Sequence, residues 1–161
     1  LTVDAVACRA GVGKATIYRR WPSKEELLLE AWMQVVQTPV DPDTGDLRED
    51  LLALLAVRER TMPDHDLQRI FPQMIAAAKV NADVAAAYRA FIAERRRPLQ
   101  AVLKRAAARG DLPADLDLDV VHDLLVAPLL YRWLVSDGPI DDRVVGTIVD
   151  TVLAGLRVTT P

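Results

Sequence analysis

The sequence has little of the chemistry on which most enzymes depend. Its 161 residues include one cysteine, Cys8, and two histidines, His65 and His122. A single cysteine excludes an intrachain disulfide and suits a reducing compartment. There is no glycine-rich phosphate loop and no spacing typical of metal ligands. We therefore expect neither an enzyme nor a bound metal or cofactor.

Long hydrophobic runs are also missing. The most apolar segment, 124–135, contains Pro128 and Arg132 and is too short to cross a bilayer. Nothing in the sequence resembles a signal peptide. These features predict a cytoplasmic protein that has no membrane partner.

Hydrophobic residues, by contrast, make up 51% of the chain, and they recur at helical spacing without strand-like alternation. Thr2, Ser23 and Asp46 are capping residues that stand where periodic segments begin, while Gly11 and Gly110 stand where such segments end. The sequence therefore predicts an all-α fold, with helices at about 3–10, 14–21, 23–37, 46–61, 67–80, 118–135 and 141–156, and a long helix that begins at Asn81 or Asp83 and ends near Arg109.

Charge is distributed unevenly along the chain. Residues 1–24 hold five basic side chains and one acid, a net charge of +4, whereas the rest of the chain has a net charge of −7. A basic head on an acidic body is typical of a nucleic-acid-binding protein that contacts phosphate at one end only. Chance clustering in a short window is the alternative explanation.

The strongest motif is the spacing of Ala7, Gly11 and Ile17. In a helix-turn-helix, a small residue sits where the two helices cross, a glycine forms the turn, and a branched apolar residue anchors the recognition helix. The motif lies between two short predicted helices inside the basic segment. It therefore predicts a DNA-binding head.

The predicted recognition helix has an inward and an outward side. If Ile17 and Trp21 face inward, then the outward residues are Lys14, Ala15, Thr16, Tyr18 and Arg19. Such side chains can reach phosphates and base edges in duplex DNA. The charge of Lys24 and the free N–H groups of the next helix can both meet a phosphate.

Residues 1–32, LTVDAVACRAGVGKATIYRRWPSKEELLLEAW, resemble the DNA-binding head of the TetR (tetracycline-repressor-like) family. The resemblance implies that Lys14, Thr16, Tyr18 and Arg19 occupy contact positions of the recognition helix. It also implies that Ala15 can touch a base methyl and that Arg20 and Lys24 contact phosphates. The family's head begins with a further helix, which is missing before Leu1.

The remainder of the chain, including APLLYRWLV at 127–135, is similar to the helical C-terminal domains of this family. The resemblance implies a transcriptional regulator, typically a repressor, that binds a palindromic double-stranded operator as a homodimer and is released by a small-molecule effector. Proline, glycine and acidic residues make 38–46 a loop. We therefore expect a helix-turn-helix domain at 1–37 and a helical effector-binding and dimerisation domain at 38–161.

The last two predicted helices carry more apolar surface than one small chain can cover. One side of the first of them can face the body, through Leu118, Val121, Leu124, Leu125, Leu129 and Trp133. The resemblance implies a two-fold four-helix interface, for which we expect Val126, Leu130, Leu134, Val145, Ile148, Val149 and Val152. The alternative is that all of these side chains form intramolecular core.

A pocket for the effector is less visible in the sequence. The larger or more polar side chains of the helical body are Trp32, Phe71, Met74, Tyr88, Phe91, His122 and Trp133. They are candidate lining residues, although aromatic residues at helical spacing commonly serve as core. A helical adaptor that binds only protein is the remaining alternative, and selective duplex binding would distinguish the two.

Overall fold

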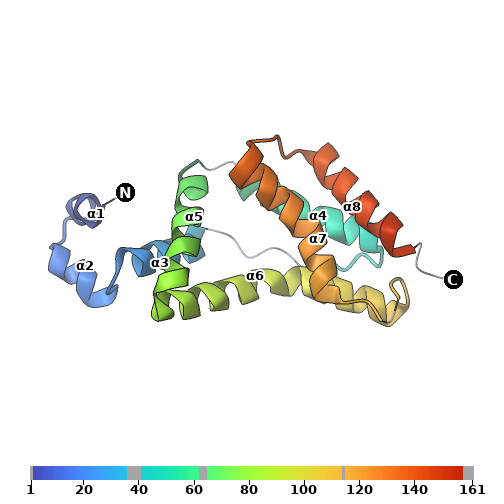
Figure 1. Ribbon diagram of the computed structural model, residues 1–161, viewed down its shortest axis with the longest axis horizontal. Coiled ribbons are helices and arrows are strands. Elements are labelled where there is room, and N and C mark those ends of the chain that lie inside the picture. The colour runs from blue at the N-terminus through green and yellow to red at the C-terminus, as the bar shows by residue number, and fades with distance from the viewer. Residues whose placement is uncertain (1, 36–40, 62–64, 114, 158–161) are drawn as a thin grey trace. The chain divides into compact units, whose positions relative to one another are not determined.

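The computed structural model describes residues 2–35, 41–61, 65–113 and 115–157, and within these ranges it contains helices and no strand (Figure 1). The predicted all-α fold is confirmed. None of the helices in this part of the chain is long and apolar enough to cross a membrane. The chain forms two compact units, residues 1–37 with 69–92 and residues 38–68 with 93–161. The division into the two domains expected from the sequence stays a prediction.

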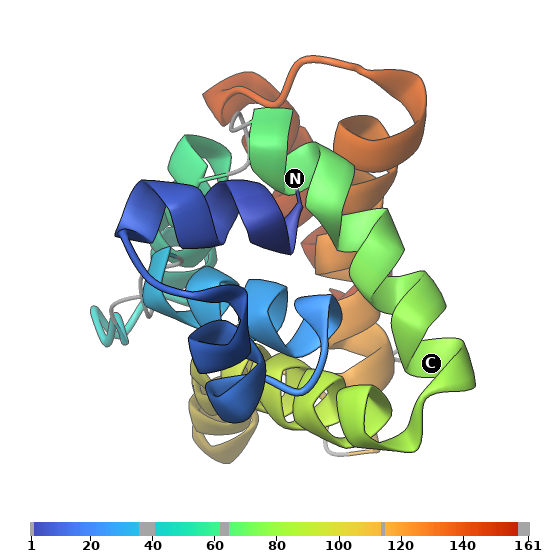
Figure 2. The ribbon, with the colours of Figure 1, turned by 90° about the vertical axis from the view of Figure 1, so that its left-hand side faces the viewer.

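The first unit contains three short helices, α1 (Val3–Ala10), α2 (Lys14–Arg20) and α3 (Lys24–Val35). It also includes most of α5 (His65–Val80) and the first part of α6 (Ala82–Arg109). Figure 2 shows α1 and α2, in dark and mid blue, joined by a short turn. The buried side chains of α3, α5 and α6 in this unit are Leu28, Leu29, Phe71, Met74, Val84 and Phe91.

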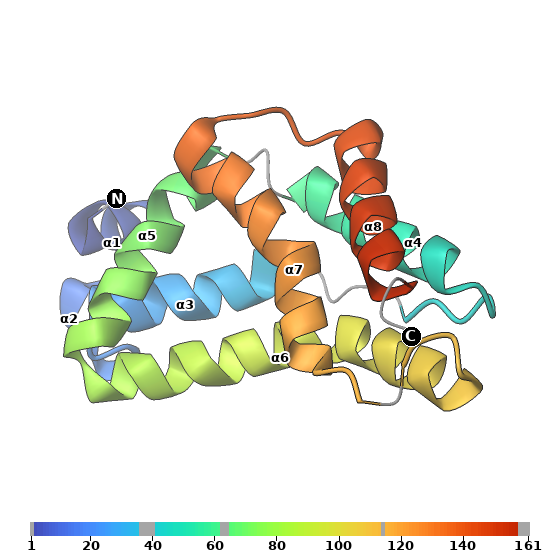
Figure 3. The same cartoon turned by 45° about the vertical axis from the view of Figure 1, so that its right-hand side comes forward.

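The second unit contains α4 (Leu47–Thr61), the rest of α6, α7 (Leu118–Tyr131), the π-helix η1 (Arg132–Ser136) and α8 (Asp142–Arg157). Figure 3 shows α8 lying beside α4 and connected to α7 through η1, and α8 packs against both of these helices. The most deeply buried apolar residues of the second unit are Leu51, Leu55, Val102, Leu103, Ala106, Val121, Leu125, Leu129, Val145 and Val149.

Polar side chains join the helices of the second unit at its surface. Arg48 of α4 donates to both carboxylate oxygens of Asp150 of α8, at 2.7 and 3.1 Å. Arg96 of α6 donates to Asp119 at 2.9 Å and to Asp123 at 2.6 Å, both on α7. These hydrogen bonds lower the pKa of the two α7 carboxyl groups. Because the pairs are largely exposed, they fix the relative placement of helices more than they add stability.

The end of α7 differs from the sequence-based prediction of one helix over 118–135. Its last turn widens into the π-helix η1, and Asp137 then takes a left-handed conformation with φ of 46°. Two backbone carbonyls of η1 accept hydrogen bonds from donors outside this helix. Gln68 donates its side-chain amide to the carbonyl of Trp133, and Gly138 donates its N–H to the carbonyl of Arg132 at 3.1 Å. The sequence holds no local signal for a side-chain donor 65 positions away.

Candidate nucleic-acid interface

The turn between α1 and α2 depends on Gly11. This residue has φ of 65°, the left-handed region that glycine adopts without strain. Its N–H and that of Val12 return to the carbonyls of Cys8 and Ala7, at 3.2 and 3.1 Å. No atom lies within 4 Å of the position that a Cβ at Gly11 would take, so backbone conformation rather than space selects glycine here. The turn-forming role predicted for Gly11 is confirmed.

A small core holds α1 against α2. Val3 and Ala7 of α1 and Ile17 of α2 are buried, with 4–6% of each residue exposed. Partly buried Trp21 packs against this cluster, as do Val6 and Leu27. Because Ile17 points into the core, the rest of the short helix α2 is turned outward. The inward orientation predicted for Ile17 is confirmed.

The outward surface of α2 carries the side chains that the sequence predicted to contact DNA. All six are exposed: Lys14, Ala15, Thr16, Tyr18, Arg19 and Arg20. Lys24 is partly buried at the first position of α3. Ser23 precedes it and accepts a hydrogen bond from the N–H of Glu26 at 3.1 Å, as expected for an N-cap. The predicted contact residues therefore share α2 and the start of α3, and their contact with DNA stays a prediction.

Two of these cations have acidic partners that the sequence did not reveal. Lys14 Nζ lies 2.9 Å from Asp4 Oδ1 and donates to its Oδ2 at 3.0 Å, and this hydrogen bond raises the pKa of Lys14. Arg20 Nη2 lies 3.4 Å from Glu30 Oε1. Within the described residues, Arg19 has neither a hydrogen bond nor an ion pair. Arg19 is therefore the cation of α2 that is most available to a phosphate or a base.

On the same head, Cys8 is exposed on α1. No group of three or more histidine, cysteine or acidic side chains in the described part of the chain is arranged to hold a metal ion.

The candidate effector residues are divided between the two units. Phe71, Met74, Tyr88 and Phe91 belong to the first unit, where the rings of Phe71 and Tyr88 have centroids 6.3 Å apart. His122 and Trp133 are buried in the second unit, and His122 Nδ1 lies 3.2 Å from Asp123 Oδ1. The side chain of Trp32 lies outside the described residues. Their role in effector binding stays a prediction.

Three residues expected at the dimer interface lie inside the second unit instead. Val126, Val145 and Val149 are 6%, 1% and 0% exposed, so they contribute to the chain's own core and offer no surface to a partner. The reason is that α8 directs part of its apolar stripe toward α4 and α7. The other four, which are Leu130, Leu134, Ile148 and Val152, are partly exposed.

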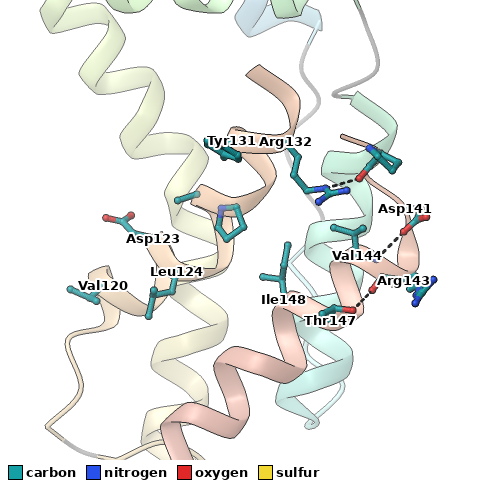
Figure 4. A pocket seen from close by; sticks show the side chains of 13 residues that line it. Val120, Asp123, Leu124, Tyr131, Arg132, Asp141, Arg143, Val144, Thr147 and Ile148 are labelled. Carbon is teal, nitrogen blue, oxygen red and sulfur yellow. Dashed lines mark hydrogen bonds between the residues drawn. The ribbon is translucent and has the colours of Figure 1, made fainter. Parts of the chain in front are cut away.

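Several exposed apolar side chains gather in a groove between α7 and α8, shown in Figure 4. The groove has a volume of about 910 Å³. Its α7 side includes Val120, Leu124 and Tyr131, which are 52%, 50% and 59% exposed, and its α8 side includes Val144 and Ile148. The sequence assigned Leu124 to the buried face and missed this groove. The spacing of 120, 124, 127, 128 and 131, one helical stripe, is the signal that could have revealed it.

The helical head, with its glycine turn and exposed basic face on α2, defines a helix-turn-helix DNA-binding protein. Residues 1–31 match the bacterial regulatory proteins of the tetR family, and residues 41–152 match the tetracyclin repressor-like C-terminal domain. The chain belongs to the TetR family of transcriptional regulators. This family consists of transcriptional regulators and not of enzymes, which confirms the expectation from the sequence that the protein is not an enzyme.

Several relatives cover nearly the whole chain. It is 36% identical over 156 residues to the uncharacterized HTH-type transcriptional regulator Rv1556 of Mycobacterium tuberculosis, covering 95% of this chain and 76% of that protein. It is also 36% identical over 159 residues to the DNA-binding transcriptional repressor TetR of Mycobacteroides abscessus, covering 94% and 80%.

Solved structures agree with this assignment. The crystal structure of the TetR family transcription regulator SCO0332 is 37% identical, with a TM-score of 0.74 and coverage of 100% of this chain and 88% of that one. The TetR family transcriptional regulator PfmR from Thermus thermophilus, at 21% identity and a TM-score of 0.62, shows the same fold and covers 97% of this chain and 89% of that one.

Proposed function

We propose that this protein is a repressor that binds a palindromic operator as a homodimer and releases it when a small-molecule effector binds. The observation that carries the proposal is the outward side of α2, where Thr16, Tyr18 and Arg19 are all exposed while Ile17 anchors the helix in the core. Such a helix fits the major groove, where side chains read base edges. The protein would act in the cytoplasm, where a bacterial operator lies.

The α7–α8 groove supports the homodimer. Exposed apolar side chains gathered along one face usually mark an interface, and a two-fold axis brings the same patch of two copies together. The proposed contacts are Leu124, Tyr131, Val144 and Ile148, together with Val120. A dimer presents two copies of α2 to successive major-groove faces, and this geometry favours a palindromic site.

The effector would act by shifting the equilibrium between two arrangements of the DNA-binding heads. If it binds one arrangement of the two heads more tightly, and that arrangement no longer matches both half-sites, the operator is released. Phe71, Met74, Tyr88, Phe91, His122 and Trp133 remain the candidate lining residues.

The decisive test is selection of a duplex from a random library by the full-length protein, followed by gel-shift titration of the selected sequence. We expect selective binding that weakens with salt by a log–log slope of about 0.9 per phosphate contacted. Binding that is no stronger for the selected duplex than for a scrambled one at moderate salt would refute the proposal.

Replacing Arg19 or Tyr18 by alanine should weaken binding to the selected operator by about 1–3 kcal/mol, roughly 5- to 150-fold, because each removes a contact of the recognition helix. Sedimentation should show an unchanged dimer, since both side chains lie on the head. If either substitution dissociates the dimer instead, the residue is structural and the assignment of this face is wrong.

Replacing Asp4 by asparagine should strengthen DNA binding. The substitution removes a negative charge and frees Lys14, whose ammonium now pairs with the Asp4 carboxylate. If Lys14 then gains a phosphate, the salt slope should steepen by about 0.9. Asp83→Asn makes the same charge change on α6 and serves as the control. An equal gain in both variants would show that general charge, rather than release of Lys14, is responsible.

A further inference from the structure

Glu30 of α3 binds the last residues of the recognition helix with both of its carboxylate oxygens. Oε2 accepts a hydrogen bond from Trp21 Nε1 at 2.7 Å, and this contact is partly buried. Oε1 lies 3.4 Å from Arg20 Nη2, an exposed contact. One carboxylate on α3 therefore contacts two consecutive residues where α2 ends.

Trp21 connects this carboxylate to the core of the head. It is the C-cap residue of α2, and its backbone N–H donates to the carbonyl of Ile17 at 2.8 Å. Its side chain packs against the buried cluster that contains Ile17, and the Arg20 guanidinium lies 5.5 Å from the centroid of its ring. The end of α2 is thereby held against the core through the Trp21 ring and against α3 through Glu30.

The short helix α2 needs such external contacts. It has seven residues, about two turns, and helices of this length are not stable in isolation. Its N-cap is Gly13, which supplies no side-chain hydrogen bond to the first turn. Ile17 and the Trp21 ring hold α2 against the core by apolar packing, which sets no precise orientation. The Trp21–Glu30 hydrogen bond adds a directional contact to α3 at the end of the helix.

We propose that Glu30 is a positioning residue for sequence-specific DNA recognition. It sets the angle of α2 through Trp21 and is not itself a DNA contact, because a carboxylate repels phosphate. The inference rests on the proposed function, in which α2 reads the operator. Two effects of opposite sign follow when Glu30 is removed. Loss of a negative charge strengthens non-specific binding, whereas misplacement of α2 weakens specific binding.

The experiment measures the ratio of dissociation constants for scrambled and selected duplexes at one salt concentration, using full-length variants. In E30A this ratio should fall about tenfold, the size expected when a hydrogen bond to a charged group is lost. E30Q keeps a neutral acceptor for the Trp21 indole and should recover most of the selectivity. E25Q removes the same charge from the same helix and should leave the ratio unchanged, because Glu25 makes no hydrogen bond to α2 within the described residues.

A second variant keeps the test valid if E30A unfolds the head. W21F retains an aromatic ring in the core but removes the indole donor, so it should lower the ratio as E30A does, and the double variant should lose no more than either single one. Unchanged selectivity in E30A and W21F, or an equal loss in E25Q, would overturn the inference. A wild-type protein without selectivity would instead overturn the proposed function, and this inference with it.

Discussion

Replacing Leu124 and Ile148 together by glutamate should turn the protein into monomers and abolish operator binding at concentrations that saturate the wild type. Both residues line the α7–α8 groove, and a two-fold interface would place four carboxylates in one apolar contact. Unpaired charges in such a contact are strongly unfavourable. A monomer presents one α2, so the gain from holding two half-sites at once, about 10²–10⁴ in affinity, is lost.

Sedimentation equilibrium and gel-shift titration on the same samples would measure the two effects. The matched control is Val80→Glu, because Val80 is an exposed apolar residue, 87% exposed, that does not line the groove. This control should remain dimeric and bind normally. A double variant that sediments as a dimer would show that the second copy does not dock in the α7–α8 groove.

Replacing Ile17 by alanine should unfold the DNA-binding head while leaving the proposed dimer intact. Ile17 is 4% exposed and is the residue through which α2 enters the small core with Val3 and Ala7. Truncation of a buried isoleucine costs about 2–5 kcal/mol. A small core has little stability in reserve, so selective DNA binding should disappear. Hydrogen exchange of residues 2–35 should rise sharply, and dimerisation should persist.

Two milder substitutions define the scale of this effect. Ile17→Val should cost about 0.5–1.5 kcal/mol and leave measurable binding. Val12→Ala removes methyl groups from a residue of the same turn that is 41% exposed. Its effect should stay within about 0.5 kcal/mol. If I17A binds the operator as tightly as V12A does, the head is not anchored through this contact.

The sequence located the helices well because their ends depend on local chemistry. Thr2 caps α1 by accepting from the N–H of Ala5 at 3.2 Å, and Asp46 caps α4 by accepting from the N–H of Glu49 at 2.9 Å. Asn81 caps α6 in the same way. Each of these contacts spans three residues, so the pattern along the chain contains the whole signal.

The rotation of α7 could not be predicted in the same way. Asp119 and Asp123 form only a narrow polar stripe on this helix, and apolar residues lie on both sides of it, so the pattern does not distinguish the face that meets the core from the face that remains exposed. Val126 therefore joined the expected interface although it is buried, and Leu124 was placed toward the body although it is half exposed. Burial there is decided by packing against α8, which lies elsewhere in the sequence.

The charge partners of the recognition helix were missed for a related reason. Asp4 and Glu30 each lie ten positions from the cation that they bind, Lys14 and Arg20. Residues ten positions apart are not neighbours on the surface of one helix, so this spacing does not predict a contact. The two pairs form because the turn at Gly11 folds α1 against α2, and because the break at Pro22 places α3 beside the end of α2. The sequence therefore identified the basic face correctly but not which of its cations are already paired.

Cys8 is a labelling site from which the distance between the two heads of the proposed dimer can be measured. It is the only cysteine in the sequence, and its thiol is exposed on α1, next to the recognition helix but not on it. A spin label or fluorophore attached to this thiol would mark each head. The distance between the two labels, measured with and without a candidate ligand, would report the separation of the heads directly and so detect an effector before its binding site is known.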